Sequence, residues 1–112
     1  MNTIPVSVII ASFNSEMYLE ECINSLNQSK QIPKQIIIVD DCSTDNSLEL
    51  SKKLRNTYKN ICIFEMKKNS GAAEARKYAL KYVTQNYVCY VDSDDVLEIN
   101  ALEDAYKKII KE

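Results

Sequence analysis

The feature that most constrains the fold of this chain is a run of four β-branched residues, Ile36 to Val39, with no polar residue among them. β-Branched side chains favour strands, and a strand with one face in water would alternate apolar with polar residues. An unbroken apolar run predicts a strand buried on both faces, as in parallel sheets that carry helices on each side. The chain therefore needs helices for two faces of one sheet.

The apolar pattern elsewhere in the chain supplies both strands and helices. Strands are predicted at 6–11, 35–40, 61–65 and 87–91. Helices are predicted at 16–28, around Leu50, Leu54 and Tyr58, from Ala72 to Val83 and at 99–111, with an exit turn at Ile32-Pro33 after the first helix. Regular alternation of the two predicts a single three-layer α/β/α domain with a mainly parallel four-stranded sheet and right-handed crossovers.

Composition excludes several classes of partner. The formal net charge is −2, so the chain has no basic field to hold nucleic acid. Nothing at the N-terminus resembles a signal peptide, and the apolar run Val6–Ala11 is too short to span a bilayer, which predicts a cytoplasmic protein. Four cysteines without a CxxC pair, in a chain with no histidine, predict reduced and mostly buried thiols, not a zinc site.

Polar residues gather where each predicted strand ends. The four clusters are Ser12-Phe13-Asn14, Asp40-Asp41, Asn69-Ser70-Gly71 and Asp92-Ser93-Asp94-Asp95. Parallel sheets bind ligands outside the carboxyl ends of their strands, at a switch point in strand order. One such cluster would suit an ordinary cap or turn, whereas four at equivalent positions predict a ligand site on one rim.

The predicted rim is rich in carboxylates. Crowded carboxylates repel one another, and Arg76 is the one cation expected nearby, so a bound cation is the natural way to keep them charged. A hard divalent ion, Mn²⁺ or Mg²⁺, accepts carboxylate oxygens together with phosphate oxygens of a ligand. The rim therefore predicts a metal ion and a diphosphate. The aspartates concerned are Asp40, Asp41, Asp92, Asp94 and Asp95.

Four stretches, in this order and spacing, resemble the family 2 glycosyltransferases with the A-type fold. They are Val6–Asn14, Gln35–Ser47, Asn69–Lys77 and Tyr87–Leu97. The resemblance implies a nucleotide-diphospho-sugar transferase-like fold with strand order 3-2-1-4. It also implies inverting transfer of a sugar from a nucleotide diphosphate sugar, a UDP-sugar above all, to a saccharide or other acceptor in cell-surface polysaccharide synthesis.

The resemblance also implies roles for individual residues. Phe13 would pack against the nucleobase, and Asp41 would accept a hydrogen bond from it. Asp94, together with Asp92, would ligate Mn²⁺ or Mg²⁺, and Arg76 would steady the acidic cluster. The nucleotide-binding set carried over from the family is Ala11, Phe13, Asn14, Asp41, Arg76, Asp92 and Ser93.

The chain departs from the family pattern in several places. Ala11 replaces a proline, Lys77 an asparagine and Cys42 a glycine; a positive φ at Cys42 would cost strain. The family's catalytic aspartate lies in an acceptor-binding half to which nothing here corresponds. Residues 1–112 are thus expected to be the nucleotide-sugar-binding half, inactive alone, with the acceptor-binding half absent. Self-association through exposed apolar surface, and peripheral membrane association of the full-length protein, stay open.

Two other functions stay open at this point. A non-catalytic nucleotide-binding module would share the fold and the site but transfer nothing. A two-component receiver domain would use Asp40-Asp41 as its acidic pair and Asp92 as phosphoacceptor, although a strand and a helix precede that pair here. Two aspartates also have plain structural interpretations, because Asp45 and Asp95 could serve as helix-capping residues and touch no ligand.

Overall fold

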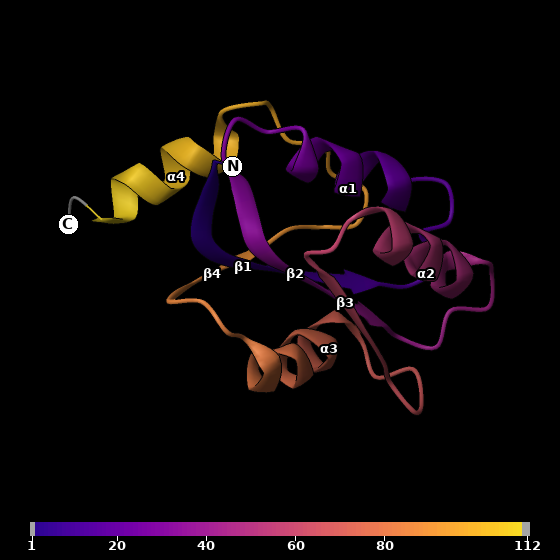
Figure 1. Cartoon of the computed structure of the whole chain (residues 1–112). Coiled ribbons are helices and arrows are strands. Elements are labelled where there is room, and N and C mark those ends of the chain that lie inside the picture. Colours follow the sequence, from indigo (N-terminus) through magenta and orange to yellow (C-terminus); the bar gives the residue numbers. More distant parts are fainter. Residues whose placement is uncertain (1, 111–112) are drawn as a thin grey trace.

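Four parallel strands form one sheet in the order β3-β2-β1-β4 (Figure 1). In this computed structural model, which describes residues 2–110, the strands are β1 Thr3–Ser12, β2 Ile32–Asp40, β3 Ile61–Glu65 and β4 Tyr87–Tyr90. Both the parallel pairing and the strand order confirm the prediction. A receiver-type sheet has its first strand between the second and third; here β1 lies between β2 and β4, which excludes that alternative.

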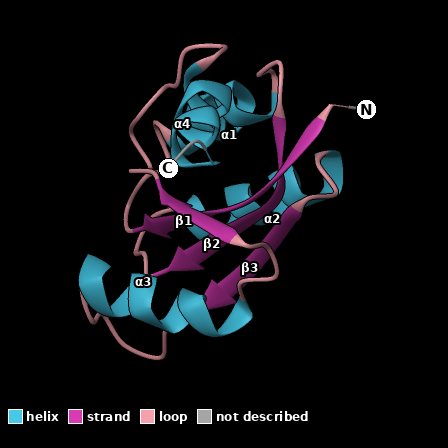
Figure 2. Cartoon of the chain, turned by 90° about the vertical axis from the view of Figure 1, so that its left-hand side faces the viewer, coloured by secondary structure: helices cyan, strands magenta, loops and turns pink. Residues whose placement is uncertain are grey.

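Helices cover both faces of the sheet and make three layers. The helices are α1 Leu19–Asn27, α2 Ser47–Thr57, α3 Ala72–Ala79, a short 3₁₀ turn Leu80–Tyr82, and α4 Ala101–Ile110. Figure 1 shows α1 and α2 above the sheet and α3 below it, and Figure 2 shows α4 on the same side as α1. A helix lies between each pair of consecutive strands, as the alternating pattern predicted.

The central strand β2 is buried on both faces. Ile36 and Ile38 pack in the core under α1, α2 and α4, while Ile37 and Val39 pack in the core over α3. All four side chains are fully inaccessible to solvent. The apolar run in the sequence therefore indicated the strand's environment correctly. On the α3 side the small residues of the helix, such as Ala75, let it approach the sheet closely.

The structure corrects several predicted boundaries. Ile32 begins β2 and does not form an exit turn, because its N–H donates to the Asn2 carbonyl (2.8 Å) and extends the ladder backwards. Residues before α1 form a turn closed on the Ser15 carbonyl, so the helix begins three residues late. Elsewhere α2 ends at Thr57, the third helix becomes 3₁₀ at Leu80, α4 begins at Ala101, and Lys111 lies outside the described residues.

Among residues 2–110, no helix has the length and hydropathy that crossing a bilayer requires. The four cysteines are free, as predicted, but only Cys22 is buried and the other three are half-buried. The prediction of mostly buried thiols was therefore wrong in its extent.

Candidate functional site

The loops that follow the four strands meet at one rim, as predicted. The Asp41 N–H donates to the Ser12 carbonyl (2.9 Å) and joins the loops after β1 and β2. The Met66 N–H donates to the Asp40 carbonyl (2.9 Å) and joins those after β2 and β3. β4 lies beside β1, so the switch point in strand order falls between these two strands. The four polar clusters therefore belong to one surface.

The loop after β4 forms an acidic turn, Asp92-Ser93-Asp94-Asp95. Carboxylate oxygens of its three aspartates all lie within 4.8 Å of one another, and all three residues are exposed. Arg76, on α3, pairs with Asp92 (Nη2 to Oδ1, 2.9 Å), and its guanidinium lies 5.8 Å from the centre of the Tyr90 ring. The arginine offsets one of three negative charges, so a hard divalent cation suits this set of oxygen donors.

Asp95 is part of this cluster, as the rim prediction expected, although the family roles assigned the metal to Asp92 and Asp94 alone. Its N–H donates to the Asp92 carbonyl (3.0 Å), which closes the turn and brings its carboxylate beside the other two. Its place as the third aspartate in four residues is the signal that put it in the predicted rim. Position within a turn, not spacing along the chain, decides which carboxylates meet.

Asp40 and Asp41 are buried and accept hydrogen bonds from neutral groups, whereas the sequence analysis considered only cations as partners for the rim aspartates. Asp41 accepts the N–H of Ser70 at Oδ1 and that of Gly71 at Oδ2, both at 2.8 Å. Asp40 accepts the Ser43 N–H (3.0 Å) and hydroxyl (2.7 Å). Both aspartates are 3% exposed. Hydrogen-bond donors satisfy these carboxylates, because the neighbouring loops turn their N–H groups toward them.

The loop after β1 carries an exposed aromatic ring and a structural asparagine. Phe13 is 46% exposed, so its ring is available at the rim, as the sequence favoured. Asn14 adopts φ 50°, a conformation that asparagine tolerates, and its side-chain oxygen accepts the N–H groups of Thr44 (2.8 Å) and Asp45 (3.3 Å). Its side chain therefore holds the loop that leads into α2. Ala11 is half-buried against the α3-side core.

Two cysteines lie next to the rim. Cys42 has φ 57°, so the cysteine that stands in place of glycine sits in the strained region, at a cost of about 1–2 kcal/mol. Its thiol donates to the Met66 carbonyl at 3.0 Å. Burial raises the pKa of the Cys22 thiol to about 12, and the nearby acidic turn adds to the rise. Cys22 therefore stays a neutral thiol, and it donates weakly to the Asp92 carbonyl (3.5 Å).

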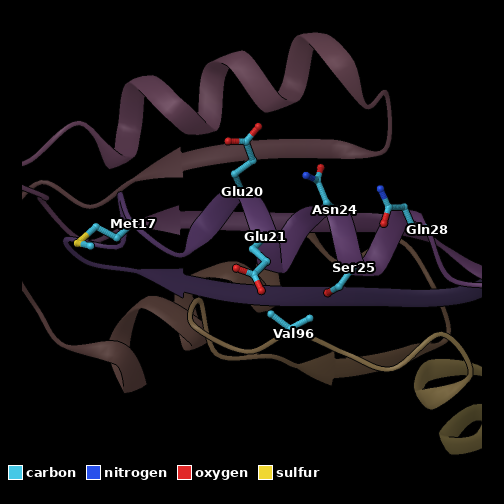
Figure 3. A pocket seen from close by; sticks show the side chains of 7 residues that line it. All are labelled: Met17, Glu20, Glu21, Asn24, Ser25, Gln28 and Val96. Atoms are coloured by element: carbon cyan, nitrogen blue, oxygen red, sulfur yellow. The ribbon is translucent and has the colours of Figure 1, made fainter.

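Two hollows of the surface lie away from the predicted site. A groove of about 460 Å³ runs along the outer side of α1, where Glu21 faces Val96 and Glu20 points away from it (Figure 3). A cavity of about 620 Å³ lies at the opposite end of the strands, beside Thr3, Ile32 and Asn60. Neither is lined by any predicted site residue. The rim is marked by its chemistry, above all by the three carboxylates of the acidic turn.

A doubly wound parallel sheet with a carboxylate turn at its switch point is the arrangement of the A-type glycosyltransferases. Comparison with known protein families and structures supports this class. The sequence model of glycosyl transferase family 2 matches residues 7–112, so the chain belongs to this family.

Two relatives illustrate the range of the family. The poly(ribitol-phosphate) β-N-acetylglucosaminyltransferase TarS of Staphylococcus aureus is 40% identical over 103 residues, covering 88% of this chain and 18% of TarS. The cholesterol galactosyltransferase of Borreliella burgdorferi is 41% identical over 104 residues, covering 92% of this chain and 28% of that protein. This chain therefore spans less than a third of the length of either relative.

A solved structure of TarS residues 1–349 in complex with UDP-GlcNAc superposes with a TM-score of 0.84 at 37% identity. The match covers 99% of this chain and 32% of the TarS chain. The likeness therefore extends over the sheet, its helices and the rim loops together.

Proposed function

We propose that this chain is the donor-binding part of a glycosyltransferase that transfers a sugar from a UDP-sugar to an acceptor, with inversion at the anomeric carbon. The observation that carries the proposal is the acidic turn at the switch point, where three exposed carboxylates meet within 4.8 Å. Such a turn suits a divalent cation that also binds a diphosphate. The family membership supplies the reaction class.

The residues divide between two parts of the proposed site. Asp94 and Asp92 would hold Mn²⁺ or Mg²⁺, with Asp95 close by, and Arg76 keeps Asp92 in place. Phe13 and Asp41 belong to the nucleoside side, where the exposed ring offers a stacking surface. When bound, the cation would stabilise negative charge on the departing nucleoside diphosphate. The roles of Ala11, Asn14 and Ser93 in nucleotide binding stay predictions.

The nucleotide is the better supported half of the donor. TarS, which is 37% identical, has been crystallised with UDP-GlcNAc and with UDP. The transferred sugar is less constrained, because relatives of nearly equal identity are named for N-acetylglucosamine and for galactose. Their names also differ in acceptor, a polymer in one and cholesterol in the other. A saccharide acceptor in cell-surface polysaccharide synthesis, and a cytoplasmic location, stay predictions.

Titration calorimetry of the chain with UDP tests the proposal. We expect binding with a dissociation constant below about 1 mM, which corresponds to roughly 4 kcal/mol. Adding Mn²⁺ should strengthen UDP binding. The manganese ratio is the dissociation constant of UDP without Mn²⁺ divided by that with Mn²⁺, and we expect it to exceed one. A ratio near one, or no heat from a folded sample, would contradict the proposal. Cytidine diphosphate serves as the control for the base.

We expect residues 1–112 alone to transfer no sugar at a useful rate. Inverting transfer needs a base that takes the proton of the acceptor hydroxyl on the side away from the leaving diphosphate. The rim aspartates are assigned to metal and nucleotide, and the chain has no histidine. We propose that a further, acceptor-binding part of a longer protein supplies the base. Product formation in an assay with UDP-sugars and simple saccharides would overturn this division of the domain.

A further inference from the structure

Ser15, which is not among the predicted site residues, connects the loop after β1 to the acidic turn after β4. Its hydroxyl lies 2.6 Å from the hydroxyl of Ser93, in a contact between residues 78 positions apart. The same hydroxyl lies 3.4 Å from the Phe13 carbonyl oxygen, to which it donates. Ser15 is 4% exposed and Ser93 is half-buried, so the contact is partly shielded from water.

The backbone of Ser15 is held on both sides. Its carbonyl accepts the N–H groups of Tyr18 (3.0 Å) and Leu19 (2.9 Å), which ties it to the start of α1. Its own N–H donates to the Ser47 hydroxyl (2.7 Å) at the start of α2. A short side chain on a backbone fixed at three points has little freedom to move, so it can restrain whatever it contacts.

Ser93 stands between Asp92 and Asp94, and its side chain turns inward to Ser15. Three carboxylates within 4.8 Å repel one another and would separate if the turn were free. A turn already held in its closed form binds a cation without first losing conformational freedom, which favours affinity. The anchor of Ser93 therefore bears directly on how well the turn accepts a metal ion.

We propose that Ser15 is a positioning residue for the metal site: it holds Ser93 inward so that the carboxylates on either side present their oxygens together. This inference rests on the proposed function. Because Ser15 also contacts the backbone of Phe13, the loop that carries the exposed ring and the acidic turn are joined through one side chain. Nucleotide and metal should consequently strengthen each other's binding, and such a coupling is reciprocal.

The test compares Ser15→Ala, Ser93→Ala and the double variant by titration with UDP, with and without Mn²⁺. Ser15→Ala keeps all three backbone contacts of Ser15 and removes only the hydroxyl. Each single variant should lower the manganese ratio by roughly fivefold, the value of one hydrogen bond of about 1 kcal/mol. The double variant should be no worse than either single variant, because both remove the same contact. In Ser15→Ala, UDP binding without Mn²⁺ should stay within about twofold.

A matched control is Ser29→Ala. Ser29 is also a buried serine, but its hydroxyl donates to the Ser25 carbonyl (2.9 Å) just beyond the far end of α1. The Ser29→Ala variant should keep the manganese ratio of the original chain, even if its melting temperature is lower. An unchanged ratio in Ser15→Ala, or additive losses in the double variant, would overturn the inference while leaving the proposed function in place.

A second measurement needs no ligand. The Asp95 N–H donates to the Asp92 carbonyl within the turn, so its exchange with solvent reports how firmly the turn is closed. In Ser15→Ala this amide should exchange roughly fivefold faster by NMR, while amides in the middle of β2 keep their rates. Equal Asp95 exchange rates in the variant and the original chain would overturn the inference. This measurement decides the role of Ser15 even if the original chain binds no UDP, the result by which the proposed function fails.

Discussion

Replacing Asp94 with asparagine is expected to remove most of the effect of Mn²⁺ on UDP binding. A neutral amide is a poor ligand for a hard cation, and the change also lowers the negative charge of the acidic turn. The manganese ratio should fall by at least about tenfold. Removing a residue that only hydrogen-bonds to a metal ligand already weakens metal binding by about that factor, and Asp94 is proposed to be a ligand itself. UDP binding measured without Mn²⁺ should stay the same or become slightly tighter, because one charge that repels the diphosphate is gone.

Asp104→Asn is the matched control for this change. Asp104 is an exposed aspartate on α4, outside the acidic turn, and the substitution is chemically identical. It should leave the manganese ratio within experimental error. If Asp94→Asn and Asp104→Asn gave the same ratio, Asp94 would not be a ligand and the acidic turn would need another explanation.

Asp41→Asn is expected to act mainly on stability. Asp41 accepts two N–H groups, one at each carboxylate oxygen, in a buried position. An asparagine side chain offers one acceptor oxygen. Its NH₂ group would face the second backbone N–H, and two hydrogen-bond donors cannot pair. Losing charge-assisted hydrogen bonds of this kind should lower the free energy of unfolding by roughly 2–4 kcal/mol. The melting temperature should fall by about 4 °C for each kcal/mol.

Urea denaturation followed by circular dichroism measures this change, with Asp95→Asn as the control. Asp95 is exposed, so its substitution should shift stability by less than about 0.5 kcal/mol. Nucleotide binding by Asp41→Asn should weaken because the loop of Ser70 and Gly71 loosens, but the manganese ratio should persist. A stability equal to that of Asp95→Asn would mean that water satisfies these two N–H groups.

The resemblance already implied different roles for these two aspartates, Asp41 at the nucleobase and Asp94 at the metal ion, and the structure adds a physical difference between them. Both aspartates lie just after a strand, and both were assigned to the same rim. In the structure Asp41 is buried and bound to backbone N–H groups, whereas Asp94 is exposed beside two other carboxylates. The first is therefore expected to shape the site, and the second to bind the ion.

The sequence by itself determined the layers and order of elements, because the signals for these are local. A run of apolar β-branched residues describes its own surroundings, and helical spacing describes which face of a segment is buried. The family pattern also located the rim residues and the strained position of Cys42, since turns of this kind depend on a few neighbouring residues.

Only the tertiary structure decided which polar side chains meet. Asp41 reaches the amides of Ser70 and Gly71 across about 30 positions, and Ser15 reaches Ser93 across 78. Such contacts depend on how loops from different strands lie side by side, and a hydrogen bond forms or fails over a few tenths of an ångström. No periodicity along the chain records that distance, so the burial of the Asp41 carboxylate and the serine that anchors the acidic turn came from the fold.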